Sequence, residues 1–136
     1  MGKYFGTDGI RGLANETLTA ERAFNVGRYL GYYYSQNGKQ NILIGKDTRL
    51  SSDMLENALA AGITSEGCNA YLAGYCPTPM ISYLVQNDDF ACGAMISASH
   101  NPFHDNGIKV FSKEGLKLSA DIENLIEQYI DHEVEI

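Results

Sequence analysis

The sequence of 136 residues has the length of one ordinary domain, and its hydrophobic fraction of 44% is enough for a single compact core. Its formal charge of −7, with ten Lys and Arg scattered along the chain, excludes a general nucleic-acid binder, because contacts with a phosphate backbone need a basic face. No apolar run reaches the roughly 18 residues of a membrane span and no signal-peptide core follows Met1, so we expect a cytoplasmic protein without a membrane partner.

The first half of the chain alternates helix and strand signals. Apolar residues recur at three- and four-residue spacings over 19–35, with Thr19 as the N-cap, which predicts a helix that stops at Asn37-Gly38. A short buried strand is expected over 41–45. A second helix is expected over 52–65.

The second half continues the alternation, with a strand over 69–73 and a helix that opens at Pro77-Thr78-Pro79 and runs to Val85. Further strands over 91–96 and 107–111 precede a closing helix over 119–132. Such alternation predicts a three-layer α/β/α domain around a mainly parallel, mixed sheet of about four strands. Functional residues are then expected in loops beyond the carboxyl ends of the strands.

The segment 96–102, Ile-Ser-Ala-Ser-His-Asn-Pro, leaves a predicted buried strand and packs hydroxyl and polar side chains into one turn. Side chains at such a strand end are presented to a ligand. The alternative is a turn in which Ser and Asn side chains only hydrogen-bond their own backbone. Local chemistry alone leaves both interpretations open.

Two further segments carry cations beside flexible backbone. Three glycines within 5–12 let the backbone approach an anion, to which Arg11 would add charge. In 105–109 an Asn-Gly turn is predicted to lead into a strand that carries Lys109. Each could instead be an ordinary surface turn with a solvated cation.

The segment 45–49, Gly-Lys-Asp-Thr-Arg, is similar to the tail of an ATP-binding P-loop. Asp47 stands where that motif requires Ser or Thr, and Gln40 occupies the position of its first glycine. We therefore reject ATP binding at this segment.

Taken together, four segments resemble the alpha-D-phosphohexomutase family in residue identity and order, and most of all its phosphoglucosamine mutase branch. They are residues 3–12, 44–49, 77–79 and 96–109. The resemblance covers the whole chain. It implies that residues 1–136 form the first α/β/α domain of such an enzyme as a single domain, and that the remaining mutase domains of an intact parent are its partners.

The resemblance also implies site roles. Ser99 matches the serine that the family carries as phosphoserine, whose phosphate also binds Mg2+. Arg11 matches an arginine that stabilises transferred charge, and Lys109 matches the general acid or base. His100 and Asn101 are assigned to shaping the loop and binding phosphate, which together with Ser99, Arg11 and Lys109 completes the predicted site.

The implied reaction converts the phosphosugar glucosamine 6-phosphate into glucosamine 1-phosphate through glucosamine 1,6-bisphosphate. The family's Asp-rich Mg2+ loop, sugar-recognition loop and phosphate-binding loop match nothing in this sequence, so we expect the chain alone to be inactive or nearly so. Asp47 and Arg49 are expected to support a sheet-edge loop without touching substrate. Formation of a homodimer is left open.

Other functions remain open as well. The parent could be a phosphomannomutase or phosphoglucomutase, because sugar choice depends on the other domains. The domain could also be a stand-alone, non-catalytic interaction module. A serine hydrolase using Ser99 and His100 is the weakest alternative, because adjacent residues seldom place nucleophile and base in hydrogen-bond reach and no Gly-x-Ser-x-Gly elbow is present.

Overall fold

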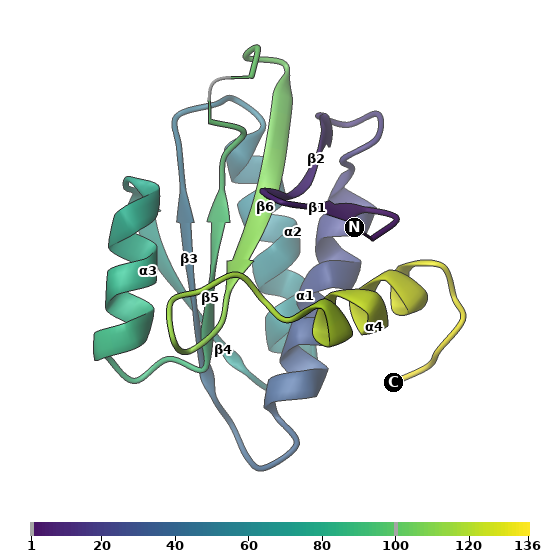
Figure 1. The fold of residues 1–136 in the computed structure, drawn as a ribbon, viewed down its shortest axis with the longest axis vertical. Coiled ribbons are helices and arrows are strands. Elements are labelled where there is room, and N and C mark those ends of the chain that lie inside the picture. The colour runs from purple at the N-terminus through teal and green to yellow at the C-terminus, as the bar shows by residue number, and fades with distance from the viewer. Residues whose placement is uncertain (1, 100) are drawn as a thin grey trace.

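The computed structural model describes residues 2–99 and 101–136. Within these ranges helices pack around one sheet (Figure 1). The elements in chain order are β1 (Phe5–Gly6), β2 (Gly9–Leu13), α1 (Ala20–Tyr34), β3 (Asn41–Lys46), α2 (Ser52–Ser65), β4 (Asn69–Tyr75), α3 (Thr78–Asn87), β5 (Cys92–Ile96), β6 (Asp105–Phe111) and α4 (Ala120–Ile130). The α/β class is confirmed, and α2 has the predicted bounds.

The described strands form one sheet of six, in the order β1-β2-β6-β5-β3-β4, where about four had been expected. The difference comes largely from the glycine-rich segment, which folds into a β1–β2 hairpin with Gly6 opposite Gly9 and is too short to show a period-two pattern. The sheet is also less parallel than predicted, since β3 runs parallel to β4 and β5 while the other described pairs are antiparallel. Only a short connection joins β5 to β6, and a parallel crossover needs a dozen or more residues.

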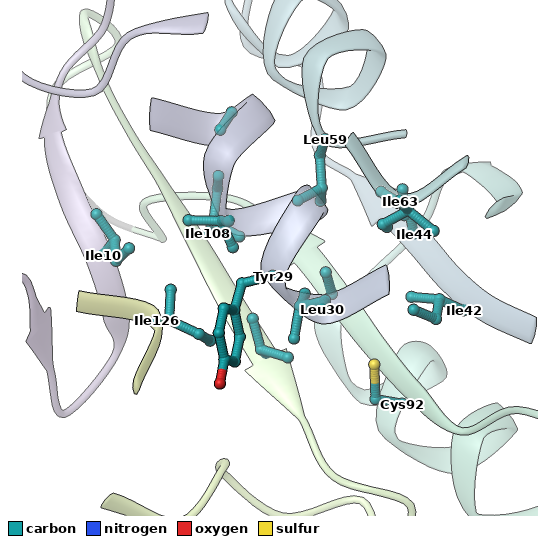
Figure 2. Packing of buried hydrophobic residues seen from close by; sticks show 14 of the residues in the cluster. Ile10, Tyr29, Leu30, Ile42, Ile44, Leu59, Ile63, Cys92, Ile108 and Ile126 are labelled. Carbon is teal, nitrogen blue, oxygen red and sulfur yellow. The ribbon is translucent and has the colours of Figure 1, made fainter. Parts of the chain in front are cut away.

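Helices cover both faces of the sheet, which confirms the three layers (Figure 1). The larger part of the core lies between the sheet and the helices α1, α2 and α4, where Figure 2 shows Leu30, Leu59 and Ile126 among the strand residues. A smaller core lies under α3 and consists of Leu43, Ile81, Val85, Met95 and Phe111. No helix in the described ranges is long and apolar enough to cross a membrane.

The predicted N-cap of α1 is confirmed, whereas the end of α4 differs from the prediction. The Thr19 hydroxyl accepts a hydrogen bond from the Arg22 amide at 3.1 Å, as an N-cap side chain should. Helix α4 ends at Ile130, two residues before the predicted end, and His132 beyond it has a φ of 61°, which is incompatible with a continuing right-handed helix.

The Asn106-Gly107 pair was predicted as a turn, and this was wrong. Both residues lie inside β6, which begins at Asp105. The Asn106 side chain is fully buried and donates to the hydroxyls of Ser51 at 2.8 Å and Ser52 at 3.1 Å. The amide therefore ties the start of β6 to the N-terminal end of α2, a role that a local turn signal does not reveal.

Candidate functional site

A pocket of about 220 Å³ is lined by Thr78 of α3 and by Met95 of β5, so it lies on the α3 side of the sheet, near the end toward which β3 and β5 run. Its position agrees with the expectation that function lies beyond the carboxyl ends of parallel strands. Three of the predicted site residues, Ser99, Arg11 and Lys109, meet in it although they come from three segments of the chain. The lining residues are Asp8, Arg11, Thr78, Met95, Ser97, Ser99 and Lys109.

Ser99 belongs to the connection between β5 and β6, which we call the Ser99 loop (the described residues of 97–104). Its side chain is exposed, and its φ of 53° places it in the left-handed region, which is uncommon for a residue other than glycine. The Ser99 amide donates to the Ser97 hydroxyl at 3.0 Å. Ser97 thus supports the backbone of Ser99. Ser99 itself has a sparsely populated backbone conformation and is exposed at the pocket.

Arg11 reaches the pocket from β2, where it is opposite Gly107 of β6. One guanidinium nitrogen, Nη1, lies 3.4 Å from the Asn101 side-chain oxygen, and Nη2 lies 3.9 Å from the Asp8 carboxylate. Its Nε is buried and has no hydrogen-bond partner among the described residues. The guanidinium is therefore only loosely engaged, and it keeps donors available for an anion.

Lys109 lies on β6 opposite Met95 of β5, and both residues line the pocket. Its ammonium nitrogen is 5.3 Å from the centre of the Phe111 ring. Among the described residues it makes no hydrogen bond or ion pair. A rigid strand thus holds an uncommitted ammonium group beside the Ser99 loop.

Asp47 and Arg49 lie outside the pocket lining but contact the Ser99 loop. The Arg49 guanidinium donates to main-chain carbonyls of that loop, including the Ser99 oxygen at 2.8 Å, and its Nε donates to Asp47 at 3.1 Å. Burial raises the pKa of Asp47, but hydrogen bonds from the Arg49 amide and from the Ser52 and Ser97 hydroxyls outweigh it and hold that pKa below its ordinary value. Asp47 thus stays ionised and anchors Arg49.

The contacts of Lys46, the lysine of the rejected P-loop interpretation, argue against phosphate binding. Its ammonium nitrogen donates to the carboxylates of Asp53 at 2.6 Å and Glu56 at 3.0 Å, and these two hydrogen bonds raise the pKa of Lys46. A lysine whose charge is balanced by two carboxylates is poorly suited to binding an anion.

Metal binding was predicted only through a phosphate on Ser99. In the part of the chain that the structure describes, no three His, Cys, Asp or Glu side chains come together as a metal site. The carboxylate in the pocket lining, Asp8, faces Arg11. These residues do not form a Mg2+ site by themselves. His100, the other predicted phosphate ligand, lies outside the described residues.

Comparison with known proteins identifies the family of this chain. The family model described as phosphoglucomutase/phosphomannomutase, alpha/beta/alpha domain I, matches residues 2–136. The chain belongs to this phosphohexomutase family. A solved phosphoglucomutase/phosphomannomutase family protein from Burkholderia thailandensis has the same fold, with a TM-score of 0.83 and 26% identity over 97% of this chain and 31% of that one.

Curated relatives in the phosphohexomutase family are more similar in sequence. The phosphoglucosamine mutase of Lachnoclostridium phytofermentans is 58% identical over 134 residues, which are 98% of this chain and 30% of that enzyme. The phosphoglucosamine mutase of Lachnospira eligens is 57% identical over 137 residues, again with 98% and 30% coverage. The chain therefore spans about 30% of the length of these relatives and corresponds to the family's first domain.

Proposed function

We propose that this chain is the phosphoserine-bearing first domain of a phosphoglucosamine mutase, which interconverts glucosamine 6-phosphate and glucosamine 1-phosphate. The observation that carries the proposal is the pocket that Ser99 shares with Arg11 and Lys109. The choice of sugar is supported by the two curated relatives at 58% and 57% identity, which are both phosphoglucosamine mutases. Three unpaired thiols in the described residues, two of them buried, suit the reducing cytoplasm in which we place the enzyme.

Phosphoryl transfer needs positioning and cationic stabilisation more than covalent chemistry by the protein. A phosphate on Ser99 brings about −1.5 to −2 charge to a pocket whose lining includes two cations and one carboxylate. In the proposed step, the bond between phosphorus and the Ser99 oxygen breaks as a bond to a sugar oxygen forms. Lys109 transfers the proton released by the sugar hydroxyl to the Ser99 oxygen that leaves the phosphorus. Arg11 holds the equatorial phosphoryl oxygens, and Asn101, with His100, binds phosphate.

The second half of the cycle returns the other phosphate of glucosamine 1,6-bisphosphate to Ser99. Mg2+ would supply further charge neutralisation, held by the Ser99 phosphate and by carboxylates of the remaining mutase domains, because the described residues offer too few ligands. A phosphomannomutase or phosphoglucomutase is the second candidate, favoured by the family description and by the Burkholderia thailandensis structure. It would use the same Ser99 chemistry on another sugar.

The direct test is the intact mass of the purified chain before and after phosphatase treatment, with the phosphate mapped by fragmentation. We expect one removable phosphate on Ser99, or uptake of one phosphate from glucosamine 1,6-bisphosphate by the unmodified chain. The Ser99→Ala variant should take up none.

Ser65→Ala provides the matched control, because Ser65 is an exposed serine in α2, away from the pocket lining. It should behave as the unaltered chain does. Phosphate that maps to another residue, or uptake that survives Ser99→Ala, would overturn the assignment of Ser99. A chain that carries no phosphate and accepts none would favour the stand-alone interaction module.

A further inference from the structure

The Ser99 loop is held by one side chain that lies far from it in sequence. Arg49 Nη1 donates to the carbonyl oxygens of Pro102 at 2.7 Å and Asp105 at 3.2 Å. Its Nη2 donates to the carbonyl oxygens of Ser99 at 2.8 Å and Asn101 at 3.0 Å. Three carbonyls of the loop and one at the first residue of β6 thus converge on one guanidinium.

The guanidinium is itself fixed in place. Asp47 accepts the Arg49 Nε and main-chain amide, both at 3.1 Å, and also the Ser52 hydroxyl at 2.9 Å. The Arg49 side chain is only 11% exposed, so water competes little for its donors. Asp47, whose main-chain amide donates to Ile96 at 3.0 Å, therefore connects Arg49 both to the end of β5 and to the start of α2.

The direction of these contacts matters for phosphate. Arg49 does not line the pocket, so the carbonyls it binds are drawn toward Arg49 and not into the pocket. Carbonyl oxygens facing a phosphate would repel it, whereas amide hydrogens and hydroxyls can bind it. Holding the Ser99 carbonyl also stabilises the left-handed conformation of this residue, which an unrestrained serine seldom adopts.

We propose that Arg49 is a positioning residue for phosphoryl transfer: it fixes the backbone of the Ser99 loop so that the Ser99 hydroxyl, and not the loop carbonyls, faces the pocket. This inference rests on the proposed function for the transfer itself. Its structural part, the restraint of the loop, stands independently. Lysine cannot replace Arg49, because one ammonium group cannot reproduce a planar fork that contacts four carbonyls and a carboxylate at once.

The test compares Arg49→Lys with Arg28→Lys. Arg28 is a suitable control because it also forms a two-nitrogen contact with a carboxylate, Glu66, but joins α1 to α2 outside the pocket lining. In Arg49→Lys we expect exchange of the Asn101 and Asp105 amides, which donate to the loop carbonyls of Ala98 and Pro102, to accelerate at least tenfold. Exchange of strand amides in β3 and β5 should stay within twofold, and Arg28→Lys should leave the loop unchanged.

The second readout is phosphate uptake from glucosamine 1,6-bisphosphate. For a positioning residue we expect the maximal rate of Ser99 phosphorylation to fall about tenfold in Arg49→Lys while the half-saturating sugar concentration stays within twofold, because Arg49 does not line the pocket. If this variant does not fold, Asp47→Asn, which leaves Arg49 present but less firmly oriented, should show the same changes to a smaller degree.

Several results would overturn the inference. Unchanged loop exchange, or acceleration spread evenly over the sheet, would show that Arg49 does not restrain the loop. A higher half-saturating sugar concentration at an unchanged maximal rate would mean that Arg49 contacts the ligand instead. If the unaltered chain accepts no phosphate, the transfer chemistry is confined to the full-length parent, and the comparison of rates is made with the remaining mutase domains added. An Arg49→Lys rate equal to that of the unaltered chain in this mixture would refute the role of Arg49 in transfer, while hydrogen exchange decides whether Arg49 holds the loop.

Discussion

Gly107 lies where the Arg11 side chain crosses from β2 toward the pocket. A Cβ atom at this position would be 2.9 Å from Arg11 Cγ and 2.7 Å from the Ser97 carbonyl oxygen. Both distances are shorter than van der Waals contact, and the second involves backbone that cannot easily move. The absence of a side chain at residue 107 thus allows the arginine and the Ser99 loop to approach one another.

Gly107→Ala should therefore displace Arg11 and reduce phosphate uptake at Ser99 by about tenfold or more. Overpacking of this kind typically costs about 1–3 kcal/mol of unfolding free energy. Urea denaturation and the uptake assay measure the two effects. Gly31→Ala is matched in strain, because its Cβ would lie 2.6 Å from the Ile63 carbonyl oxygen, between α1 and α2. It should lose similar stability yet keep uptake, and equal loss of uptake in both variants would contradict the role of Gly107.

At this scale the sequence marks the candidate site residues, whose roles remain predictions, and it assigns Arg49 a supporting role without revealing the contacts behind it. Ser99, Arg11 and Lys109 were found because short local motifs and the family resemblance mark them, and the structure brings them together. The contacts of Arg49 with Ser99 span 50 residues of sequence, and a spacing pattern carries no information about such pairs. Four converging carbonyls are visible only once the backbone is in place.

Among the elements, α4 holds the N-terminal strand in position. The Glu127 carboxylate accepts the main-chain amides of Tyr4 at 2.7 Å and Phe5 at 2.8 Å, and its residue is only 7% exposed. Burial raises the pKa of Glu127, but the amides of Phe5, Tyr4 and Lys3 outweigh it and hold the pKa below its ordinary value. The first strand therefore depends on an ionised side chain from the last helix.

Glu127→Gln should lower the free energy of unfolding at pH 7 by about 1.5–3 kcal/mol, the range for hydrogen bonds to charged groups. Because the folded-state pKa of Glu127 is lowered, its stabilisation is complete above the ordinary carboxyl pKa and is lost as pH falls through the folded-state value. The difference between the variant and the unaltered chain should therefore shrink in acid. Urea unfolding at neutral and acidic pH measures it.

Glu114→Gln is the control for this pH effect, since Glu114 is exposed and accepts no hydrogen bond from the described residues. Its stability should match the unaltered chain at both pH values. A Glu127→Gln deficit that persists at low pH would point to lost packing instead of a lost charge.

Elements with a strong local pattern were predicted closely, and those defined by partners were not. Helix α2 and the buried strands β3 and β5 have continuous apolar or periodic runs, and their bounds agree to within a residue or two. Strand β1 has two residues and exists only because β2 pairs with it. The direction of β6 relative to β5 likewise follows from tertiary pairing, which sequence periodicity does not encode.

On the scale of the whole molecule, a chain of net charge −7 places Arg11 and Lys109 at one pocket and commits other cations to local partners. Lys46, Arg28 and Lys117 are each paired with carboxylates outside that pocket. The pocket thus places two cations near Ser99 in an acidic chain, which favours phosphate there.

The chain alone should carry phosphate without completing the mutase cycle. It spans about 30% of its relatives' length, and its described residues supply too few ligands for Mg2+. We expect no conversion of glucosamine 6-phosphate above background by the chain alone, and recovery of activity when the remaining mutase domains are added as a separate polypeptide. The same mixture made with Ser99→Ala should stay inactive. Full activity of the isolated chain would disprove that the mutase cycle needs the remaining domains.

The placement of β2 also sets an order on synthesis. In the described sheet β2 pairs only with β1 and with residues 105–108 of β6, so the strand that carries Arg11 has no lasting partner until some hundred later residues have left the ribosome. Closing so long a loop is slow relative to forming the β5–β6 hairpin. Once β6 has been made, β5 and β6, which flank the Ser99 loop and carry Lys109, can pair first, and Arg11 joins them only when β2 docks on β6. A nascent chain therefore lacks the three-residue site until most of its domain has been synthesised.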